Sequence, residues 1–597
     1  MEKEGKTGAT RRDFLKGAAL LGAGIVGSGA LAACSPTDSG AATGSTDSTG
    51  GTDSTAADNS TLSGSAQASG ELTWLPQEPD ITDDQVESEV TADVIVVGCG
   101  VSGTAAVRSA AEEGASVVAF EKADSPQGRS GDYAIINGDL EAQWGRNNFD
   151  TDMLVDHEMD EMSYYPKRAI LDKWAKGCAE VFSWYIAAKP DLYICKDTFT
   201  PIPDANASLA LYPWFYPLPE KYDWTKEKHP TYPSSVGFSP DQVPVIQANF
   251  DKAVAEGNVT PYFGHFVEKL IMEGDRVVGC YARNASTGKY VKATANKGLI
   301  LSTGEYGSNS QMVDYYCPSI RINGIPGFFP NTDVEGNPTN MGDGLKLGAW
   351  VNAAIQDHHA PMVHWMGFPA VGTAPFLRLN RDGKRFMNED MPGQQVENQI
   401  EGQPGRTIWG FWDSGWPDQV PYFPAQHGGI CYVGDVPKNF QYMGSEGGFI
   451  SQSMIDDAVT SGTIFKADTL DALFDLMPDI DKATGLASID HYNQLAKAGK
   501  DDDFGKEPSR LFALENPPYY AASCGVSGML VCLGGLESDE DCHVYDNNRK
   551  IIPGLYVSGN AQGNRYAVMY PIALKGVSHS LALFYGYVAG KSAANQV

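Results

Sequence analysis

A glycine-rich turn between a strand pattern and a helix pattern is the feature that most constrains this fold. Asp93–Val97 is a run rich in β-branched residues suited to a buried parallel strand, and it leads into Gly98-Cys99-Gly100-Val101-Ser102-Gly103. A helix pattern follows over Thr104–Glu113, and a second strand pattern over Val117–Phe120 ends at Glu121-Lys122. This order of strand, helix and strand predicts a Rossmann-like nucleotide-binding unit.

Each glycine of the turn has a defined task at a dinucleotide. Gly98 makes the tight turn, Gly100 lets the backbone approach a pyrophosphate, and Gly103 lets helix and strand pack closely. The N-terminus of the helix then faces the phosphates, and Glu121 can accept hydrogen bonds from the ribose hydroxyls. The alternative is a glycine turn without a ligand, and the terminal acid argues against it. The predicted cofactor-binding residues of this unit are Gly98, Gly100, Val101, Ser102, Gly103, Glu121 and Lys122.

Two later segments extend the nucleotide-binding pattern to the other end of the chain. Lys297–Glu305 has the pattern of a strand that runs into a small-residue turn. Ile552–Asn560 is again a strand pattern that ends in a glycine, and a small-residue helix pattern follows over Ile572–Ala594. A nucleotide site spread across both chain ends favours FAD over NAD as the cofactor. The further predicted FAD-binding residues are Ser130, Gly131, Thr303, Gly304, Gly559 and Asn560.

With these segments the chain resembles the FAD-binding family that contains soluble fumarate reductases, urocanate reductase and 3-ketosteroid dehydrogenases. The resemblance runs from about Val90 to the C-terminus, and it includes Met341–Gly344, Asn380–Glu389, Asp501–Gly505 and Pro517–Tyr520. It implies an α/β fold in which a Rossmann-like FAD-binding domain carries an inserted α+β capping domain. The implied boundaries are an FAD-binding domain over 71–345 and 515–597 and a capping, substrate-binding domain over 346–514.

The same resemblance implies a reaction type. A small-molecule substrate would lie between the capping domain and the isoalloxazine ring. Hydride would pass between flavin N5 and one carbon of an activated double bond, while an acid or base handles the proton at the neighbouring carbon. The chain is therefore expected to be an FAD-dependent oxidoreductase acting on CH–CH groups, and no metal site is predicted.

This sequence lacks two substrate-binding or catalytic residues that fumarate and urocanate reductases carry. Fumarate and urocanate reductases carry a proton-delivering arginine shortly after the Asn-Glu pair, but Asn388-Glu389 is followed by Asp390–Gln395, which contains none. They also place a substrate-binding histidine before the Gly-Gly-Leu segment, and Leu530–Leu533 has none before Gly534. Because an anion without partners is costly in a desolvated site, fumarate itself is not the expected substrate.

The remaining catalytic candidates lie mostly in the C-terminal segment. Arg565 resembles the second carboxylate-binding arginine of the family. Tyr566 and Tyr570 are candidates for proton transfer, since tyrosines supply the acid and base in ketosteroid dehydrogenases and a nearby cation would lower a phenol's pKa. The alternative for each tyrosine is a packed aromatic side chain. His359, with His358 and His364 beside it, lies where the family has a substrate histidine, and a structural role is the alternative.

The N-terminal 70 residues predict export. A positively charged start precedes Arg11-Arg12-Asp13-Phe14-Leu15-Lys16 and an apolar run over Gly17–Ala33, which indicates a twin-arginine signal over 1–34 rather than a short helix of the mature fold. Leu31-Ala32-Ala33-Cys34 resembles a lipobox, so lipidated Cys34 would hold the protein at the outer face of the cytoplasmic membrane. Plain cleavage, which would release it into the periplasm, is the alternative. Residues 35–70 have the composition of a disordered tether.

Charge and cysteine content exclude other classes of protein. The net charge of −31 would repel nucleic acid. The sequence has no Cys-x-x-Cys, haem-attachment or iron–sulfur motif, so electrons must come from a separate cytochrome or flavoprotein. The chain is thus expected to reduce an enoate or enone with electrons from that donor. A dehydrogenase of the ketosteroid type and a lipid-anchored electron-relay protein without its own substrate stay open as alternatives.

Overall fold

The computed structural model describes residues 72–197, 209–213, 218–324, 327, 330–364, 367–391, 393–424, 429–435, 448–526 and 528–596. The predicted signal segment over 1–34 and the predicted tether over 35–70 lie outside these ranges. Within them, no helix combines the length and the hydrophobicity needed to cross a membrane.

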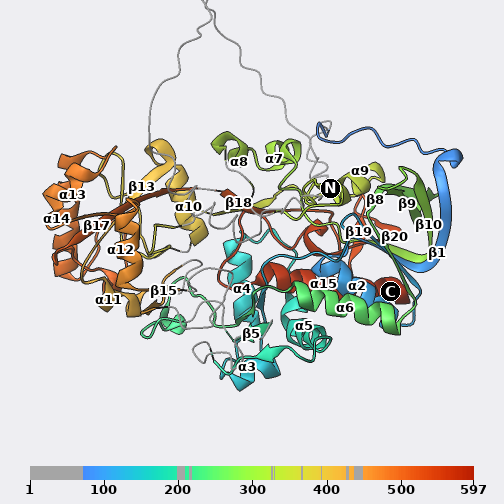
Figure 1. Cartoon of the computed structure of the whole chain (residues 1–597), viewed down its shortest axis with the longest axis horizontal. Coiled ribbons are helices and arrows are strands. Elements are labelled where there is room, and N and C mark those ends of the chain that lie inside the picture. The colour runs from blue at the N-terminus through green and yellow to red at the C-terminus, as the bar shows by residue number, and fades with distance from the viewer. Residues whose placement is uncertain are drawn as a thin grey trace, which may run out of the picture. The chain divides into compact units, whose positions relative to one another are not determined.

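A mixed, largely parallel sheet forms the centre of the FAD-binding domain (Figure 1). In the described part of the chain it has eight strands, in the order β19-β20-β10-β1-β2-β7, with β9 beside β10 and β8 beside β9. The pairs β20–β10, β10–β1, β1–β2 and β2–β7 are parallel. The strands are β1 (Val86–Val97), β2 (Val117–Glu121), β7 (Val259–Phe263), β8 (His265–Glu273), β9 (Arg276–Asn284), β10 (Tyr290–Leu301), β19 (His543–Tyr545) and β20 (Ile551–Val557). The predicted α/β fold with a Rossmann-like domain is confirmed.

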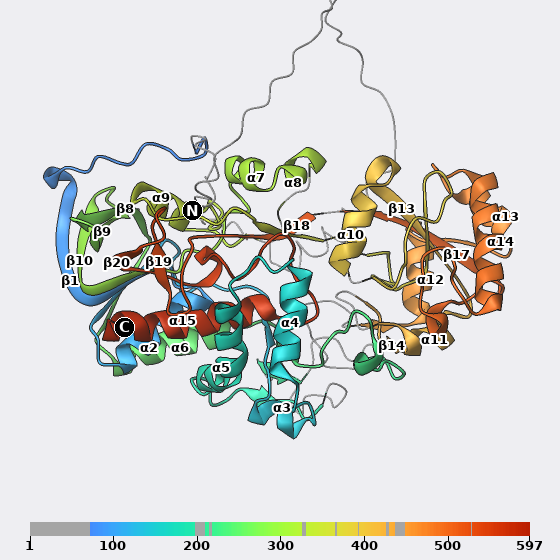
Figure 2. The same ribbon diagram turned by 180° about the vertical axis from the view of Figure 1, so that it is seen from behind.

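Three helices lie together against this sheet, as both views show (Figures 1 and 2). They are α2 (Val101–Glu112), α6 (Val243–Glu256) and α15 (Val577–Asn595). Helix α15, the last element of the chain, packs along α2, the first of the three. The contact is close because α15 carries glycine there: a Cβ atom on Gly586 would lie 2.1 Å from the Ser102 carbonyl oxygen. The helix predicted from Ile572 begins later, at Val577, because Gly576 has a left-handed φ of 79°.

A second layer of the FAD-binding domain contains a small sheet in the order β3-β6-β5-β4. Its strands are β3 (Asp132–Ala134), β4 (Tyr193–Ile194), β5 (Ala210–Tyr212) and β6 (Ser235–Ser239), and its helices are α3 (Asp139–Gln143), α4 (Thr151–Glu161) and α5 (Arg168–Ile186). Helix α5 packs on α15, and α4 packs on α5. This layer therefore places α4 beside the loop that precedes α15, where Ile572 donates its backbone N–H to Glu161.

The capping domain is built on an antiparallel sheet in the order β12-β13-β17-β16. Its strands are β12 (Leu377–Asn380), β13 (Thr407–Asp413), β16 (Phe465–Ala467) and β17 (Tyr519–Gly525), and the short pair β14 (Tyr432–Val433) and β15 (Phe449–Ile450) lies apart from them. Its helices are α10 (Gly393–Glu401), α11 (Trp416–Gln419), α12 (Gln452–Thr460), α13 (Leu470–Leu476) and α14 (Lys482–Ala498).

The predicted boundaries of the capping domain need correction at both ends. The boundary at residue 514 would remove β17, which pairs along the whole length of β13. The boundary at 346 falls inside α9 (Asp343–Trp350), which packs on β8 of the main sheet. Both errors have one cause, since strand pairing and helix docking involve partners that are distant in sequence.

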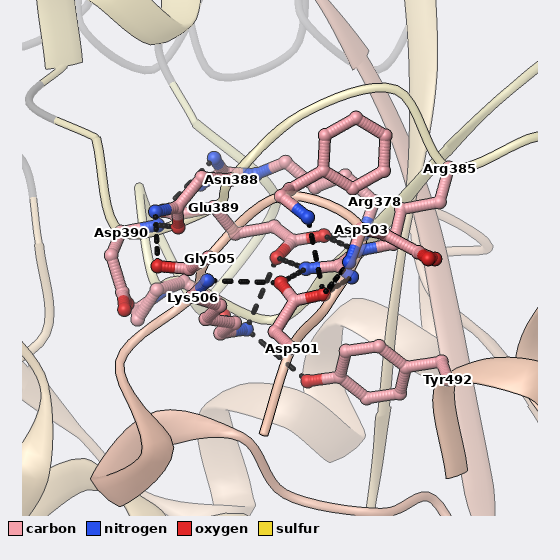
Figure 3. A network of polar contacts seen from close by, with 12 residues as sticks. Arg378, Arg385, Asn388, Glu389, Asp390, Tyr492, Asp501, Asp503, Gly505 and Lys506 are labelled. Atoms are coloured by element: carbon pink, nitrogen blue, oxygen red, sulfur yellow. Dashed lines mark hydrogen bonds and ion pairs between the residues drawn. The ribbon is translucent and has the colours of Figure 1, made fainter. Parts of the chain in front are cut away.

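A buried ionic network holds the capping domain together (Figure 3). The Arg385 guanidinium binds Glu389 at 2.9 Å and Asp501 at 2.7 Å, and the Lys506 ammonium lies 3.4 Å from Glu389. Burial opposes ionisation of Glu389, but Lys506 and Arg385 outweigh it and lower the pKa of this carboxyl. The two motifs Asn380–Glu389 and Asp501–Gly505 therefore meet here, and they serve the architecture of the capping domain.

Candidate functional site

A cavity of about 410 Å³ lies at the carboxyl ends of the parallel strands. In an open α/β sheet this is the edge at which ligands bind. Ten of the predicted cofactor residues line it: Gly98, Gly100, Val101, Ser102, Glu121, Lys122, Thr303, Gly304, Gly559 and Asn560. Gly103, Ser130 and Gly131 do not line it. Three segments that are far apart in the sequence thus contribute to one cavity wall.

The wall of this cavity includes an anion-binding helix end. Helix α2 begins after Gly100 without a side-chain cap and without an acidic residue in its first turn. Its first amide groups therefore lack intrahelical acceptors and can bind a diphosphate. A Cβ atom on Gly100 would meet nothing closer than the Gln127 carbonyl oxygen, at 3.8 Å, so the absence of a side chain keeps space open beside these amides.

Gly103 has a different role from Gly100. A Cβ atom on Gly103 would lie 1.7 Å from the Gly98 carbonyl oxygen, so only glycine allows α2 to approach the turn after β1 this closely. This packing is the task that the sequence motif predicts for the third glycine.

Glu121 ends β2 as a carboxylate that faces the cavity. Its two oxygens accept backbone hydrogen bonds from Cys99 at 2.7 Å and from Ala123 at 2.9 Å. Burial raises the pKa of this carboxyl, and the two amide donors act in the opposite direction. Because each carboxylate oxygen has a second lone pair, Glu121 can still accept hydrogen bonds from ribose hydroxyls.

Three serines join the three cofactor segments at one point. The Ser102 hydroxyl lies 2.7 Å from that of Ser558, and the Ser302 hydroxyl lies 2.8 Å from the same Ser558 oxygen. Sequence reasoning named Ser102 but missed Ser302 and Ser558, although both lie next to predicted residues. Lys122 is held in turn by Asp343 at 2.6 Å, and Asp343 belongs to the motif Met341–Gly344.

Arg565 lies beside this cavity. Its side chain is fully buried, and its Nη2 donates to the side chain of Asn560, a cavity-lining residue, at 3.1 Å. Its Nε donates to the Gln562 carbonyl oxygen at 3.2 Å, while Nη1 has no hydrogen-bond partner among the described residues. Burial lowers the pKa of this guanidinium, but arginine keeps its charge in proteins. A buried cation with an unused donor is suited to an anionic ligand.

Comparisons with known proteins agree with this arrangement. Residues 214–577 match the family described as FAD binding domain. The chain belongs to this family. It is 26% identical over 541 residues to vinyl phenol reductase from Lactiplantibacillus plantarum, covering 84% of this chain and 96% of that protein. It is 25% identical to a cytochrome-type fumarate reductase from Shewanella frigidimarina, covering 87% of this chain and 78% of that protein.

A solved structure supports the fold. The 3-ketosteroid dehydrogenase from Rhodococcus jostii aligns over 87% of this chain and 99% of its own, with a TM-score of 0.61 and 19% sequence identity. The cavity, the uncapped helix end and the cavity-facing carboxylate all fit FAD. The predictions of FAD as cofactor and of an FAD-dependent oxidoreductase acting on CH–CH groups are confirmed by these matches.

The two tyrosines of this flavoprotein lie beside the arginine, as predicted, but their acidity differs from the prediction. The rings of Tyr566 and Tyr570 stack with centroids 5.5 Å apart, and the Arg565 Cζ lies 5.3 Å from the Tyr566 centroid. Burial raises the pKa of Tyr566, and the opposing effect of Arg565 is smaller. Burial also raises the pKa of Tyr570. The expectation that the cation lowers a phenol's pKa was therefore wrong in its net sign, because desolvation dominates.

His359 is engaged within the protein. Its Nδ1 lies 2.5 Å from the Tyr306 hydroxyl, its Nε2 lies 2.9 Å from the Gln356 carbonyl oxygen, and its ring stacks on Tyr316. Burial lowers the pKa of His359 to about 3, so the imidazole is neutral. Both ring nitrogens of His359 therefore have partners within the protein. His358 is exposed, and the side chain of His364 lies outside the described residues.

Sequence reasoning missed one residue that joins these groups. Gln356 accepts the Asn564 N–H at 2.6 Å and donates to the Tyr566 carbonyl oxygen at 2.9 Å. Since its own carbonyl oxygen contacts His359, Gln356 links the histidine to the segment that carries Arg565. No local sequence pattern marks Gln356, because both of its partner segments are brought to it by tertiary structure.

Proposed function

We propose that this flavoprotein is an exported reductase of an activated carbon–carbon double bond in a small enoate or enone. The observation that carries the proposal is the buried guanidinium of Arg565, whose Nη1 has no partner among the described residues and which contacts the cavity wall through Asn560. Such a group binds the carboxylate or carbonyl oxygen of a substrate and stabilises negative charge that develops there during reduction.

The protonation state of Tyr566 and Tyr570 favours reduction of a double bond over dehydrogenation of a saturated substrate. When bound and reduced by the electron donor, FAD would supply the hydride that adds to one carbon of the double bond. Since burial raises the pKa of Tyr566 and Tyr570, both phenols keep their protons at neutral pH. A protonated phenol beside Arg565 donates a proton to the neighbouring carbon, whereas dehydrogenation would need a tyrosinate base.

The electron donor in this proposal is a separate protein. The sequence holds no haem-attachment or iron–sulfur motif that would carry electrons to the flavin within this chain. The Arg11-Arg12 signal pattern and Cys34 support a route through the twin-arginine pathway to a lipid anchor outside the cytoplasm. A cytochrome or flavoprotein of the membrane would then reduce the enzyme.

Anaerobic oxidation of reduced viologen by the FAD-loaded protein tests the activity. The substrate panel contains cinnamates, other enoates, vinyl phenols and steroid enones. We expect turnover of at least one enoate or enone, and we expect Arg565→Met to lower kcat/KM by about 100-fold or more while FAD content stays unchanged. Arg168→Met is the matched control, because Arg168 is an exposed arginine on α5. Dehydrogenation of a saturated ketone without any reductase activity would contradict the proposal.

Export is tested separately from catalysis. We expect the wild-type protein in the membrane fraction, outside the cytoplasm, with a diacylated N-terminal cysteine at position 34 by mass spectrometry. Replacing Arg11 and Arg12 together by lysine should leave the protein in the cytoplasm. Recovery of wild-type protein in the cytoplasm alone would contradict this half of the proposal.

A further inference from the structure

Two buried cysteines from opposite sides of the capping insertion lie next to each other. The Cys532 Sγ is 4.0 Å from the Cys317 Sγ, and the two residues are 215 positions apart in the sequence. Cys317 lies between α7 (Ser310–Tyr316) and α8 (Pro318–Asn323), before the capping domain. Cys532 lies after it, in β18 (Gly528–Leu533), which pairs with β11 (Ala360–His364). Both side chains are almost fully buried.

The surroundings of the pair connect it to the cofactor cavity. The Tyr306 hydroxyl lies 3.5 Å from the Cys317 sulfur. The Cys532 backbone N–H donates to the Glu305 carboxylate at 3.3 Å, and Glu305 lines the cavity. The backbone of Cys532 thus contacts a residue of the cavity wall, while its sulfur lies 3.0 Å from the Met529 sulfur. In Figure 1 the helices α7 and α8 lie close to β18, in agreement with the distance between the sulfur atoms.

We propose that Cys317 and Cys532 form a disulfide bond in the exported protein, as a covalent tie across the base of the capping domain. Bond formation needs the sulfur atoms to approach from 4.0 Å to about 2.05 Å. The inference rests on the export half of the proposed function, since disulfides persist in oxidising compartments. It does not depend on the substrate.

The oxidant in this proposal is a low-molecular-weight disulfide. When local opening of the α7–α8 segment exposes Cys317, its thiolate attacks one sulfur of that molecule, a mixed disulfide forms, and one small thiol leaves. The Cys532 sulfur then attacks Cys317, the intramolecular disulfide forms, and the second small thiol leaves. Two cysteine thiols are thereby oxidised and one small disulfide is reduced to two thiols. The hydrogen bond from Cys532 lowers the pKa of Cys317, which makes Cys317 the first nucleophile.

The proposed bond closes a very long loop. The chain between the two cysteines includes β12, β13, β16 and β17, that is, the whole sheet of the capping domain. A cross-link over so many residues restricts the unfolded chain, which stabilises the folded protein. It also joins the α7–α8 segment covalently to β18.

Differential alkylation of the full-length, FAD-loaded protein tests the bond. The protein is recovered from the cell envelope under acid quench, unfolded, alkylated and digested. A second sample is first incubated in an oxidising glutathione buffer. We expect a Cys317–Cys532 cross-linked peptide pair in both samples, and its loss after reduction. We also expect reduction to lower the thermal midpoint by several degrees in the wild type but not in Cys317→Ser.

Controls separate the outcomes. Cys280→Ser, a variant of a buried cysteine in β9, should keep the cross-link and the shift on reduction. Free Cys317 and Cys532 thiols in both wild-type samples would overturn the proposal. This result does not depend on whether any variant folds. The protein could be found only in the cytoplasm and still form the cross-link in the glutathione buffer. That result would support the Cys317–Cys532 disulfide and contradict export. A different cysteine pairing would also overturn the proposal.

Discussion

Arg510 of the capping domain binds the carboxylate of Glu227 in the FAD-binding domain through both terminal guanidinium nitrogens. Its third nitrogen, Nε, donates to the Tyr422 carbonyl oxygen at 2.6 Å. The arginine side chain is 5% exposed and the glutamate side chain 17% exposed, so water screens the pair only weakly. This ion pair ties the two domains together through residues that are 283 positions apart in the sequence.

Removal of one partner of this pair should destabilise the protein strongly. We expect Arg510→Met to lower the free energy of unfolding by about 3 kcal/mol, because Glu227 is left as a partly buried charge without its main partner. The double variant with Glu227→Gln should recover part of that loss. Urea unfolding of the four proteins measures the coupling. Lys482→Met, in an exposed ion pair with Asp475, is the control and should leave stability nearly unchanged.

The geometry of the cofactor cavity predicts that a substitution at Gly100 prevents FAD binding but not folding. A side chain at position 100 would project into open space, so Gly100→Val should fold but retain less than about a tenth of the wild-type flavin, because its methyl groups occupy the diphosphate position. Flavin absorbance per protein and the Kd of the apoprotein for FAD measure the effect. Gly288→Asn, in an open turn with a φ of 71°, is the control. Full flavin content in Gly100→Val would contradict the assigned role of α2.

The local parts of the FAD-binding domain could be predicted from the sequence. The β1–α2–β2 unit follows from patterns within about 30 residues, as does each strand that ends at a glycine. The meeting of Ser102, Ser302 and Ser558 could not be predicted, since each serine lies in a separate segment. The same holds for the Arg510–Glu227 pair and for β17, whose partners are distant along the chain.

The candidate catalytic residues show the same limit. The Asn-Arg pair located Arg565, and the structure places Asn560 and both tyrosines around it. The net effect on the tyrosine pKa values depends on burial, which the residue pattern near Arg565 does not contain. The contacts of both His359 nitrogens likewise come from tertiary structure.

Glu161 predicts a pH dependence of stability. Burial raises the pKa of its carboxyl to about 7, from an ordinary value near 4.5. The native state therefore holds this proton more tightly than the unfolded state, so the contribution to stability is complete below about pH 4.5 and is lost as the pH rises through about 7. We expect Glu161→Gln to show a smaller fall in unfolding free energy between pH 5 and pH 8 than the wild type. Chemical unfolding across that range measures it, with exposed Glu220→Gln as the control.

Asp501 predicts the opposite dependence in acid. Although burial acts to raise its pKa, the hydrogen bonds from Arg385 lower it to about 2. The stabilisation is therefore complete above about pH 4 and is lost as the pH falls through about 2. We expect Asp501→Asn to cost about 3 kcal/mol at pH 7 and clearly less near pH 2. Asp502→Asn, an exposed neighbour, is the control, and an equal loss at both pH values would contradict this assignment.

The packing of the last helix against the first has a consequence for biosynthesis. Gly98 is made early, whereas Asn560, His579 and Ala582 of the same cavity wall are made more than 450 residues later. A nascent chain on the ribosome lacks that wall until α15 has been synthesised. We therefore expect stable cofactor loading only after α15 has emerged, and a truncated product that lacks α15 should contain no flavin.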